Sequence, residues 1–534
     1  MPWNMWSLWK KHNGKYPRRL REIPEGGFLL RIFREKLGIL SSKEVTKMDA
    51  YTPRQVPAYP TPVSPEAVRD IFRDAADLSW REIRAGDHVL TAFFIDGLCA
   101  SGAISEYVIE PVAENSWEGS QEQVFRQCLE GKIYNAVAKP CEDMDALCQF
   151  LVNGFCVVVF PELQKAAAFE TRTPEKRNPS PPEVENTVKG AKDAFTETVR
   201  TNTSLIRRHL RTPELQVWET VVGRRSLTNV SVLSVRGLTD PNLVQMVKRR
   251  LDKIDVDGVL SPAAVEEYLT GSRKTAFPLL QYTERTDRFC QGLLDGQVGV
   301  LVDGLPLGYL APVDVGQLLT GAEDRGGSAM VCSAMRLVRY AALLVALLLP
   351  ALYVAMARFH PAMIPTKLLR AIIESKQNVP FPAAVEVVGL LIAFELLQEA
   401  GLHLPQSIGH TVSIIGGLVV GTAAVEASLI SPAALIVVSV AGICGFAVPG
   451  KDFSDAVRLW RFALTLASSV AGLFGLSVGV VCLMIHLGSI ESCGRPYLAP
   501  FSAASGRDAI LRRRLVTRKF RPEAFGATDQ RNQR

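Results

Sequence analysis

The hydrophobic and polar positions divide the chain into three stretches. The sequence is mixed and charged up to residue 336, is dominated by Leu, Val, Ala, Ile and Gly over 337–486, and is strongly basic after residue 507. An average over the whole chain therefore describes none of the three. The pattern predicts a soluble part, an α-helical membrane domain over 331–500, and a basic tail over 501–534.

Three apolar runs in the middle stretch are long enough for a bilayer, because a helix needs about 20 apolar residues to cross a core about 30 Å thick. They are 337–357, 408–449 with a break at Ser431-Pro432, and 462–487. We read them as one, two and one crossings. The chain is therefore predicted to be an integral, multi-spanning membrane protein.

Basic residues suggest how the chain is oriented. Arg336 and Arg339 precede the first run, and the C-terminal tail is rich in Arg. Short basic segments stay on the cytoplasmic side of a membrane. The N-terminus has no apolar core of the kind that signal peptides contain. We predict that the soluble part and the tail are both cytoplasmic, which requires an even number of crossings.

The soluble part separates into two lobes. Residues 1–65 form a basic lead-in spotted with proline, predicted to be poorly ordered. The stretch TRTPEKRNPSPPEVENT at 171–187 is rich in proline and charge, which is typical of a linker. Two soluble lobes, 66–170 and 188–330, remain on either side of it.

The two lobes look like copies of one unit. LTAFFIDGLCASGAISEYVI (90–109) and VSVLSVRGLTDPNLVQMVKRRL (230–251) both read as an apolar strand, a glycine turn and a helix. LCQFLVNGFCVVVF (147–160) likewise matches FCQGLLDGQVGVLV (289–302). The offsets are 140 from Gly97 to Gly237 and 142 from Gly154 to Gly296. We infer an internal duplication and predict two α/β lobes, with α+β as the other possibility.

Two lobes joined by a linker either close around a ligand by a hinge or form a rigid platform for assembly, and both interpretations stay open.

No phosphate-binding loop, zinc-protease, serine-hydrolase or dinucleotide motif occurs, and the ten cysteines form no CxxC pair. We therefore predict no enzyme activity, cofactor or metal site. The net charge of +6 comes mainly from the two basic ends. We attribute it to membrane topology and anionic lipids, not to nucleic acid.

Carboxylates interrupt apolar sequence in two places. FPAAVEVVGLLIAFELLQEAGLHLP (381–405) contains Glu386, Glu395 and Glu399, and Glu426 lies in the following apolar run. An acidic residue at the centre of a spanning helix costs roughly 2.5–3.5 kcal/mol. Three interpretations of 381–405 remain: an interfacial or re-entrant helix, a helix spanning within a bundle, or a helix lining a water-filled path. If the chain forms an ion path, these four carboxylates are the candidate pore or gating residues.

Pairs of glycines occur at a spacing of four in the membrane domain. They are Gly417 with Gly421, and Gly475 with Gly479. Small residues at this spacing allow helix backbones to approach closely in lipid. We predict that these four glycines pack helices together.

The longest motifs resemble a known family, the spore germination receptor A subunits of the GerA type. The likeness is carried by 380–438, by CLMIHLGSIESCGRPYLAPFS (482–502), and by ERTDRFCQGLLDGQVGVLVDGLPLGYLAPV (284–313) in the soluble part. It extends over about 70–525 and does not include residues 1–60.

The resemblance implies a role in bacterial spores. Members of this family lie in the inner spore membrane with a transporter-like B subunit and a lipoprotein C subunit, and they sense nutrient germinants and start ion release. A subunits of this type are thought to form homo-oligomers with an ion-conducting path. For this chain the resemblance implies an oligomeric ion channel that transduces germinant sensing. A secondary transporter with a regulatory cytoplasmic domain is the alternative, although transporters tend to carry their repeats among the spans.

Overall fold

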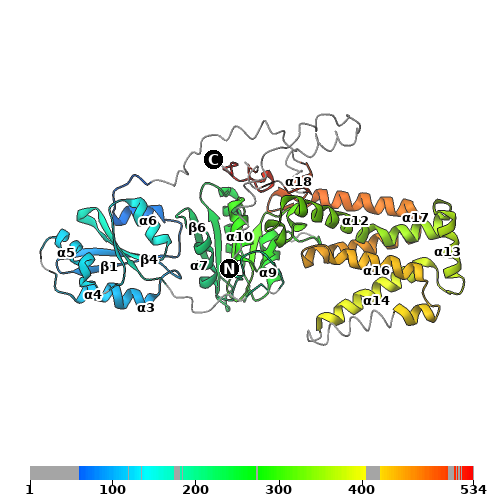
Figure 1. Cartoon of the computed structure of the whole chain (residues 1–534), viewed down its shortest axis with the longest axis horizontal. Helices are drawn as coiled ribbons and strands as arrows, with labels where there is room; N and C mark the ends of the chain where they lie inside the picture. The colour runs from blue at the N-terminus through cyan, green and yellow to red at the C-terminus, as the bar shows by residue number, and fades with distance from the viewer. Residues whose placement is uncertain are drawn as a thin grey trace, which may run out of the picture. The chain divides into compact units, whose positions relative to one another are not determined.

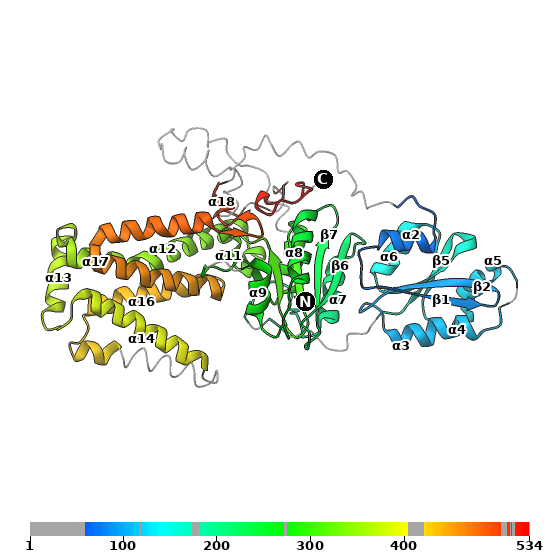
Figure 2. The same ribbon diagram turned by 180° about the vertical axis from the view of Figure 1, so that it is seen from behind.

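The computed structural model describes residues 59–532, with gaps at 118, 134, 173–180, 183, 272–274, 404–420, 503–509, 513, 515–517 and 519. Most of the predicted lead-in, 1–65, and parts of the linker and tail thus lie outside the described residues. Two opposite views are given in Figures 1 and 2.

Each lobe contains one five-stranded sheet. The strands of lobe 1 (residues 66–170) are β1 (Leu78–Ala85), β2 (His88–Ile95), β3 (Ala138–Cys141), β4 (Phe155–Phe160) and β5 (Lys165–Glu170). Those of lobe 2 (residues 188–330) are β6 (Leu215–Val222), β7 (Thr228–Val235), β8 (Gln281–Thr283), β9 (Val298–Val302) and β10 (Gly308–Ala311). The spatial orders are β1-β2-β4-β5-β3 and β6-β7-β9-β10-β8. The two orders are the same, as an internal duplication predicts.

The sheets differ from the α/β prediction in one respect. Every neighbouring pair of these strands is antiparallel, from β1 with β2, where Leu78 lies opposite Ile95, to β6 with β7, where Leu215 lies opposite Val235. Helices that flank an antiparallel sheet give an α+β lobe. The short turns that contain Asp87 and Gly223 explain the antiparallel pairing of the first two strands of each lobe, because a tight turn can only join antiparallel strands.

Helices cover both faces of each sheet (Figures 1 and 2). Lobe 1 has α2 (Pro65–Ile71), α3 (Ser101–Ile104), η2 (Ser105–Ile109), α4 (Glu110–Glu114), α5 (Gln121–Gln127), η3 (Cys128–Lys132), α6 (Met144–Val152) and η4 (Pro161–Leu163). Lobe 2 has α7 (Val199–His209), α8 (Pro241–Asp252), α9 (Pro262–Thr270), α10 (Thr286–Leu294), α11 (Val315–Leu318) and η5 (Ala322–Arg325). One hydrophobic core lies on each face of each sheet, so each lobe is a three-layer unit.

The glycines that carry the sequence repeat occupy equivalent turns. Gly97, Gly154, Gly237 and Gly296 all have a positive φ, between 76° and 99°. Residues with a Cβ rarely adopt this conformation, so the turns require glycine. The two turns of a lobe lie at the same edge of its sheet, where the second strand ends and its antiparallel neighbour begins.

The helical domain (residues 329–489) follows lobe 2. It contains α12 (Ala329–Phe359), η6 (Pro361–Met363), α13 (Thr366–Lys376), α14 (Ala383–His403), α16 (Pro432–Phe446) and α17 (Lys451–Ser489). After it come β11 (Glu491–Ser492), β12 (Arg495–Pro496), α18 (Ala499–Ser502) and η8 (Glu523–Phe525). Within the segment 381–405, residues Ala383–His403 form one helix, α14. Its Val387 and Leu391 pack in a core with Val354 of α12 and Val438 of α16.

α17 reverses its direction at Gly472, whose φ of 60° and ψ of −138° are not helical. A Cβ added at Gly479 would lie 2.5 Å from Leu464. In a straight helix these residues would be about 22 Å apart along the axis. α17 is therefore a hairpin of two antiparallel helices, and its reversal falls inside the third apolar run, 462–487. Only a glycine at the turn allows such a tight reversal.

Among the described residues, α12 and the whole of α17 have the length and apolar composition of a membrane span, although the α17 hairpin divides its length between two arms. Their most apolar 18-residue windows are only 39% and 22% buried within the chain. α16 is apolar but shorter. Much of the apolar surface of the domain thus faces outward.

Candidate functional site: buried ion pairs of the helical domain

Glu395 of α14 lies between two arginines of α17. One carboxylate oxygen accepts a hydrogen bond from Arg461 Nη2 at 2.8 Å, and the other accepts one from Arg458 Nη1 at 2.8 Å. Arg458 also contacts Asp455 and Gln398. The Arg461 side chain is 2% exposed and that of Glu395 is 28% exposed. Two cations and two carboxylates thus neutralise one another among apolar helices.

This network follows from helical spacing. Arg458 and Arg461 are three residues apart, as are Glu395 and Gln398, so each pair lies on one face of its helix. A buried charge is tolerated only when it is paired and hydrogen-bonded. The sequence alone assigned Glu395 no counter-charge, and the structure gives it two, Arg458 and Arg461.

Glu386, at the other end of α14, is held by two further elements. Its carboxylate lies 2.8 Å from Lys376 Nζ of α13 and accepts hydrogen bonds from the backbone N–H (2.9 Å) and hydroxyl (2.6 Å) of Ser431. The Glu386 side chain is fully buried. Because Ser431 caps the N-terminus of α16, the carboxylate lies where a helix favours negative charge.

The other two predicted carboxylates lie elsewhere. Glu399 and Glu426 are both exposed at the surface of the helical domain. The structure therefore places Glu386 and Glu395 in separate buried networks and does not bring the four carboxylates together.

The predicted glycine pairs differ in what they contact. A Cβ added at Gly475 would lie 2.2 Å from the backbone oxygen of Ala467, across the α17 hairpin, and Gly479 meets Leu464 there. Gly421 faces Leu435 of α16 at 3.5 Å. Gly417 lies outside the described residues. The second pair thus permits close packing within one hairpin.

Sequence reasoning missed the cations Lys376, Arg458 and Arg461. Arg458 and Arg461 directly precede the third apolar run, and Lys376 precedes the segment that contains Glu386. Matching each acid in an apolar segment with nearby unassigned cations would have found them.

A third buried cluster joins the helical domain to lobe 2. The Asp324 carboxylate of η5 accepts hydrogen bonds from Arg336 Nε at 3.1 Å and Arg339 Nη1 at 2.6 Å, both from α12. The two arginines that suggested the membrane topology therefore also fix the start of α12 to the lobe. Ion pairing to a buried carboxylate is compatible with a position near the membrane surface.

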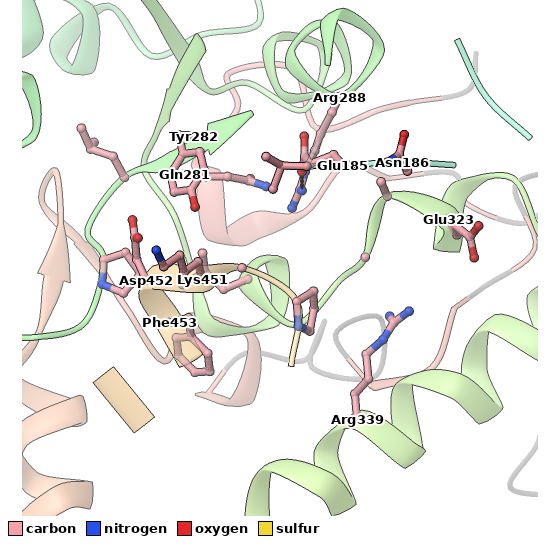
Figure 3. A pocket seen from close by; sticks show the side chains of 18 residues that line it. Glu185, Asn186, Gln281, Tyr282, Arg288, Glu323, Arg339, Lys451, Asp452 and Phe453 are labelled. Carbon is pink, nitrogen blue, oxygen red and sulfur yellow. Dashed lines mark hydrogen bonds and ion pairs between the residues drawn. The ribbon is translucent and has the colours of Figure 1, made fainter. Parts of the chain in front are cut away.

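A cavity of about 360 Å³ opens beside this cluster (Figure 3). Tyr282 of β8 and the first turn of α17, with Lys451 and Asp452, line the cavity, and Arg339 lies at one end. Nearby, burial raises the pKa of Glu266 in α9 to about 7, with a smaller contribution from the Asp452 carboxylate. The boundary between lobe 2 and α17 thus contains a group that titrates near neutral pH.

The two lobes are connected by a buried, bidentate ion pair. Arg207 Nε and Nη2 of α7 each donate to an Asp77 carboxylate oxygen at 2.6 Å, and both side chains are 1% exposed. Beside it, Ala76 N–H donates to the Val217 carbonyl oxygen at 2.8 Å, and Val217 N–H donates to that of Asp74 at 3.0 Å. These contacts favour the rigid platform over a hinge, because a hinge motion would break buried charge pairing.

Comparison with known proteins places most of the chain in one group. Residues 66–524 match the family model described as Bacillus/Clostridium GerA spore germination protein. Spore germination protein KA of Bacillus subtilis (strain 168) is 34% identical over 484 residues, covering 88% of this chain and 89% of that protein. GerLA of Bacillus cereus, a spore germination protein, is 30% identical over 467 residues, covering 86% and 95%.

A solved structure also aligns with the chain. It is the N-terminal domain of the A subunit of the Bacillus megaterium spore germinant receptor GerK3, with 22% identity and a TM-score of 0.37. The alignment covers 48% of this chain and 98% of that one.

Proposed function

The chain belongs to the GerA family of spore germination proteins, and from this premise we propose that it is the membrane A subunit of a nutrient germinant receptor in bacterial spores. In this proposal it acts with the B and C subunits of the receptor. The helical domain lies in the inner spore membrane, and the two lobes and the tail lie on the cytoplasmic side.

The exposure of the apolar helices supports the membrane location. A core helix of a soluble protein is mostly buried, whereas most of the apolar windows of α12 and α17 face outward. Ile443, Phe474 and Val470 are each more than half exposed. Such surface is stable in lipid and would aggregate in water.

The observation that carries the mechanistic proposal is the network of Glu395, Arg458 and Arg461. We infer that it belongs to the resting state, because the paired charges hold α14 against α17 and compensate one another among the apolar helices. Separating the two helices would free one carboxylate and two guanidinium groups. These groups would then face water along an ion path, formed between copies of the chain in an oligomer.

Germinant binding can drive this change only through a difference in affinity between two states. We propose that the change reaches the helices through lobe 2. Asp324 fixes α12 to the lobe, α12 packs against α17, and the first turn of α17 adjoins β8. A displacement of lobe 2 therefore reaches α17, the helix that carries Arg458 and Arg461.

The receptor role is tested in a strain that lacks the gene. Its spores should lose germination in response to at least one amino acid or sugar, and the wild-type gene should restore that response. Spores should still germinate with a non-nutrient trigger, which shows that the later steps are intact. Normal germination of the deletion strain with every nutrient tested would overturn the proposal.

A further inference from the structure

The glycine turns of each lobe form one surface, which we call the turn face. In lobe 1 it consists of Asp96–Leu98 and Asn153–Gly154, and in lobe 2 of Arg236–Leu238 and Asp295–Gly296. The sequence repeat relates these residues, so Asn153 corresponds to Asp295 and Leu98 to Leu238. Equivalent surfaces in a duplicated fold provide an internal comparison of what each one binds.

The turn face of lobe 1 binds lobe 2. A Cβ added at Gly97 would lie 3.2 Å from the Arg200 carbonyl oxygen of α7. Arg211 Nη1 donates to the Asn153 side-chain oxygen at 3.3 Å, and Arg200 lies 3.5 Å from Asp96. The turn face of lobe 1 therefore binds an arginine-bearing segment of lobe 2 that packs closely against Gly97.

The turn face of lobe 2 binds the C-terminal segment in a similar way. Arg518 Nη2 donates to Asp295 at 3.3 Å, and Arg521 Nε donates to the Leu294 carbonyl oxygen at 2.8 Å. Thr528 N–H donates to the Leu238 carbonyl oxygen at 2.8 Å. A Cβ added at Gly296 would lie 2.7 Å from the Ala527 Cβ.

The C-terminal segment is shaped for this contact. An antiparallel bridge between Phe520 and Arg531 closes residues 520–531 into a loop, and Arg521 N–H donates to the Gln530 carbonyl oxygen inside it at 2.7 Å. Phe525 and Ala527 are buried, at 4% and 6% exposure. A basic tail serving only lipid attraction would not pack Ala527 against Gly296 of lobe 2.

We infer that the turn face of lobe 2 is a binding site for an arginine-bearing protein segment, and that residues 518–531 of the same chain are its ligand. The segment contacts the turn face of lobe 2 in the way that α7, from lobe 2, contacts the turn face of lobe 1. The segment covers the turn face of lobe 2 and attaches lobe 2 to the part of the chain that follows the helical domain. This inference does not depend on ion conduction.

Hydrogen exchange of the full-length protein in detergent tests the contact directly. The Thr528 amide should exchange at least tenfold more slowly than in a free peptide of residues 518–534. Asp295→Ala should speed its exchange, whereas Asn153→Ala, at the equivalent position of lobe 1, should not. Free-peptide exchange rates for 520–531 in the wild-type protein would overturn the inference.

Peptide binding provides the second test. A protein that ends at residue 514 should bind a labelled peptide of residues 518–534 in fluorescence anisotropy. The full-length protein should bind it at least tenfold more weakly, because its own segment competes at a high effective concentration. A peptide with R518A and R521A should bind weakly to the shortened protein. Equal binding by both proteins, or by both peptides, would contradict the proposed site.

Discussion

At the scale of single residues, buried charges with partners hold the helical domain together and join the two lobes. Glu395 with Arg461, Glu386 with Lys376 and Asp77 with Arg207 are all at or near full burial on at least one side. Removing one member of such a pair leaves a charge that neither water nor protein compensates. The cost of truncation should therefore be much larger at these sites than at exposed carboxylates.

Glu395→Ala should lower the stability of the helical domain by roughly 3 kcal/mol, because Arg461 would remain buried without a carboxylate. Thermal unfolding of the detergent-solubilised protein measures this effect. Glu426→Ala is the matched control, since Glu426 is exposed on the same domain, and its effect should stay within about 0.5 kcal/mol. Equal melting temperatures for the two variants would argue against the buried network.

Asp77→Ala should likewise cost roughly 3 kcal/mol by leaving Arg207 unpaired between the lobes. The double variant Asp77→Leu, Arg207→Met should cost less than the sum of the two single changes, because it removes both charges. A double-mutant cycle on the melting transition measures the coupling. Strict additivity would mean that the pair does not join the lobes energetically.

At the scale of elements, local sequence determines turns and caps more firmly than it determines helix ends. The glycine turns of the two lobes could be predicted, because a repeated glycine after an apolar strand has few alternatives. The reversal inside α17 could not, since Gly472 lies within an uninterrupted apolar pattern in which glycines usually pack helices. The strand pairing also needed the structure, as hydrophobic runs do not distinguish antiparallel from parallel neighbours.

Gly475→Ala should destabilise the α17 hairpin by about 1–3 kcal/mol, because the new methyl group would meet the Ala467 backbone oxygen. Gly479→Ala should cost less, since it meets the flexible end of Leu464. Gly488→Ala is the control, with no atom within 4 Å of its Cβ. Thermal melting of the three variants measures the order, and a cost at Gly488 equal to that at Gly475 would contradict the hairpin.

Glu266 predicts a pH dependence at the boundary between lobe 2 and α17. Burial raises its pKa from 4.5 to about 7 in the folded protein. The folded state therefore favours the protonated carboxyl, and this stabilisation is full below pH 4.5 and is lost as the pH rises through 7.

Glu266→Gln should consequently raise the free energy of unfolding at pH 8 by on the order of 1 kcal/mol, which a higher melting temperature would show. The same change should have little effect at pH 5. Glu267→Gln, at the exposed neighbouring position, should change stability equally little at both pH values. An unchanged difference between wild type and Glu266→Gln across this range would exclude the proposed titration.

At the scale of the whole molecule, sequence reasoning identified the family and predicted a repeated unit, and the two sheets have the same strand order. The same reasoning gave all four glutamates one pore or gating role. Residue spacing shows which side chains share a face of a helix, but it does not show which helix packs against that face. The partners Lys376, Arg458 and Arg461 come from other helices, so only tertiary packing reveals them. The contact between the C-terminal segment and lobe 2 was missed for the same reason.

The central claim is that the chain converts nutrient sensing into ion release through its helical domain. Potassium release from spores of the deletion strain, complemented with wild type, Glu395→Gln or Glu426→Gln at equal protein amounts, tests it most directly. Weakening the pairing of the resting state should shift the equilibrium toward release. Glu395→Gln spores should then release potassium at a nutrient concentration several-fold lower than wild type, with Glu426→Gln unchanged. Identical nutrient dependence for all three would contradict the account.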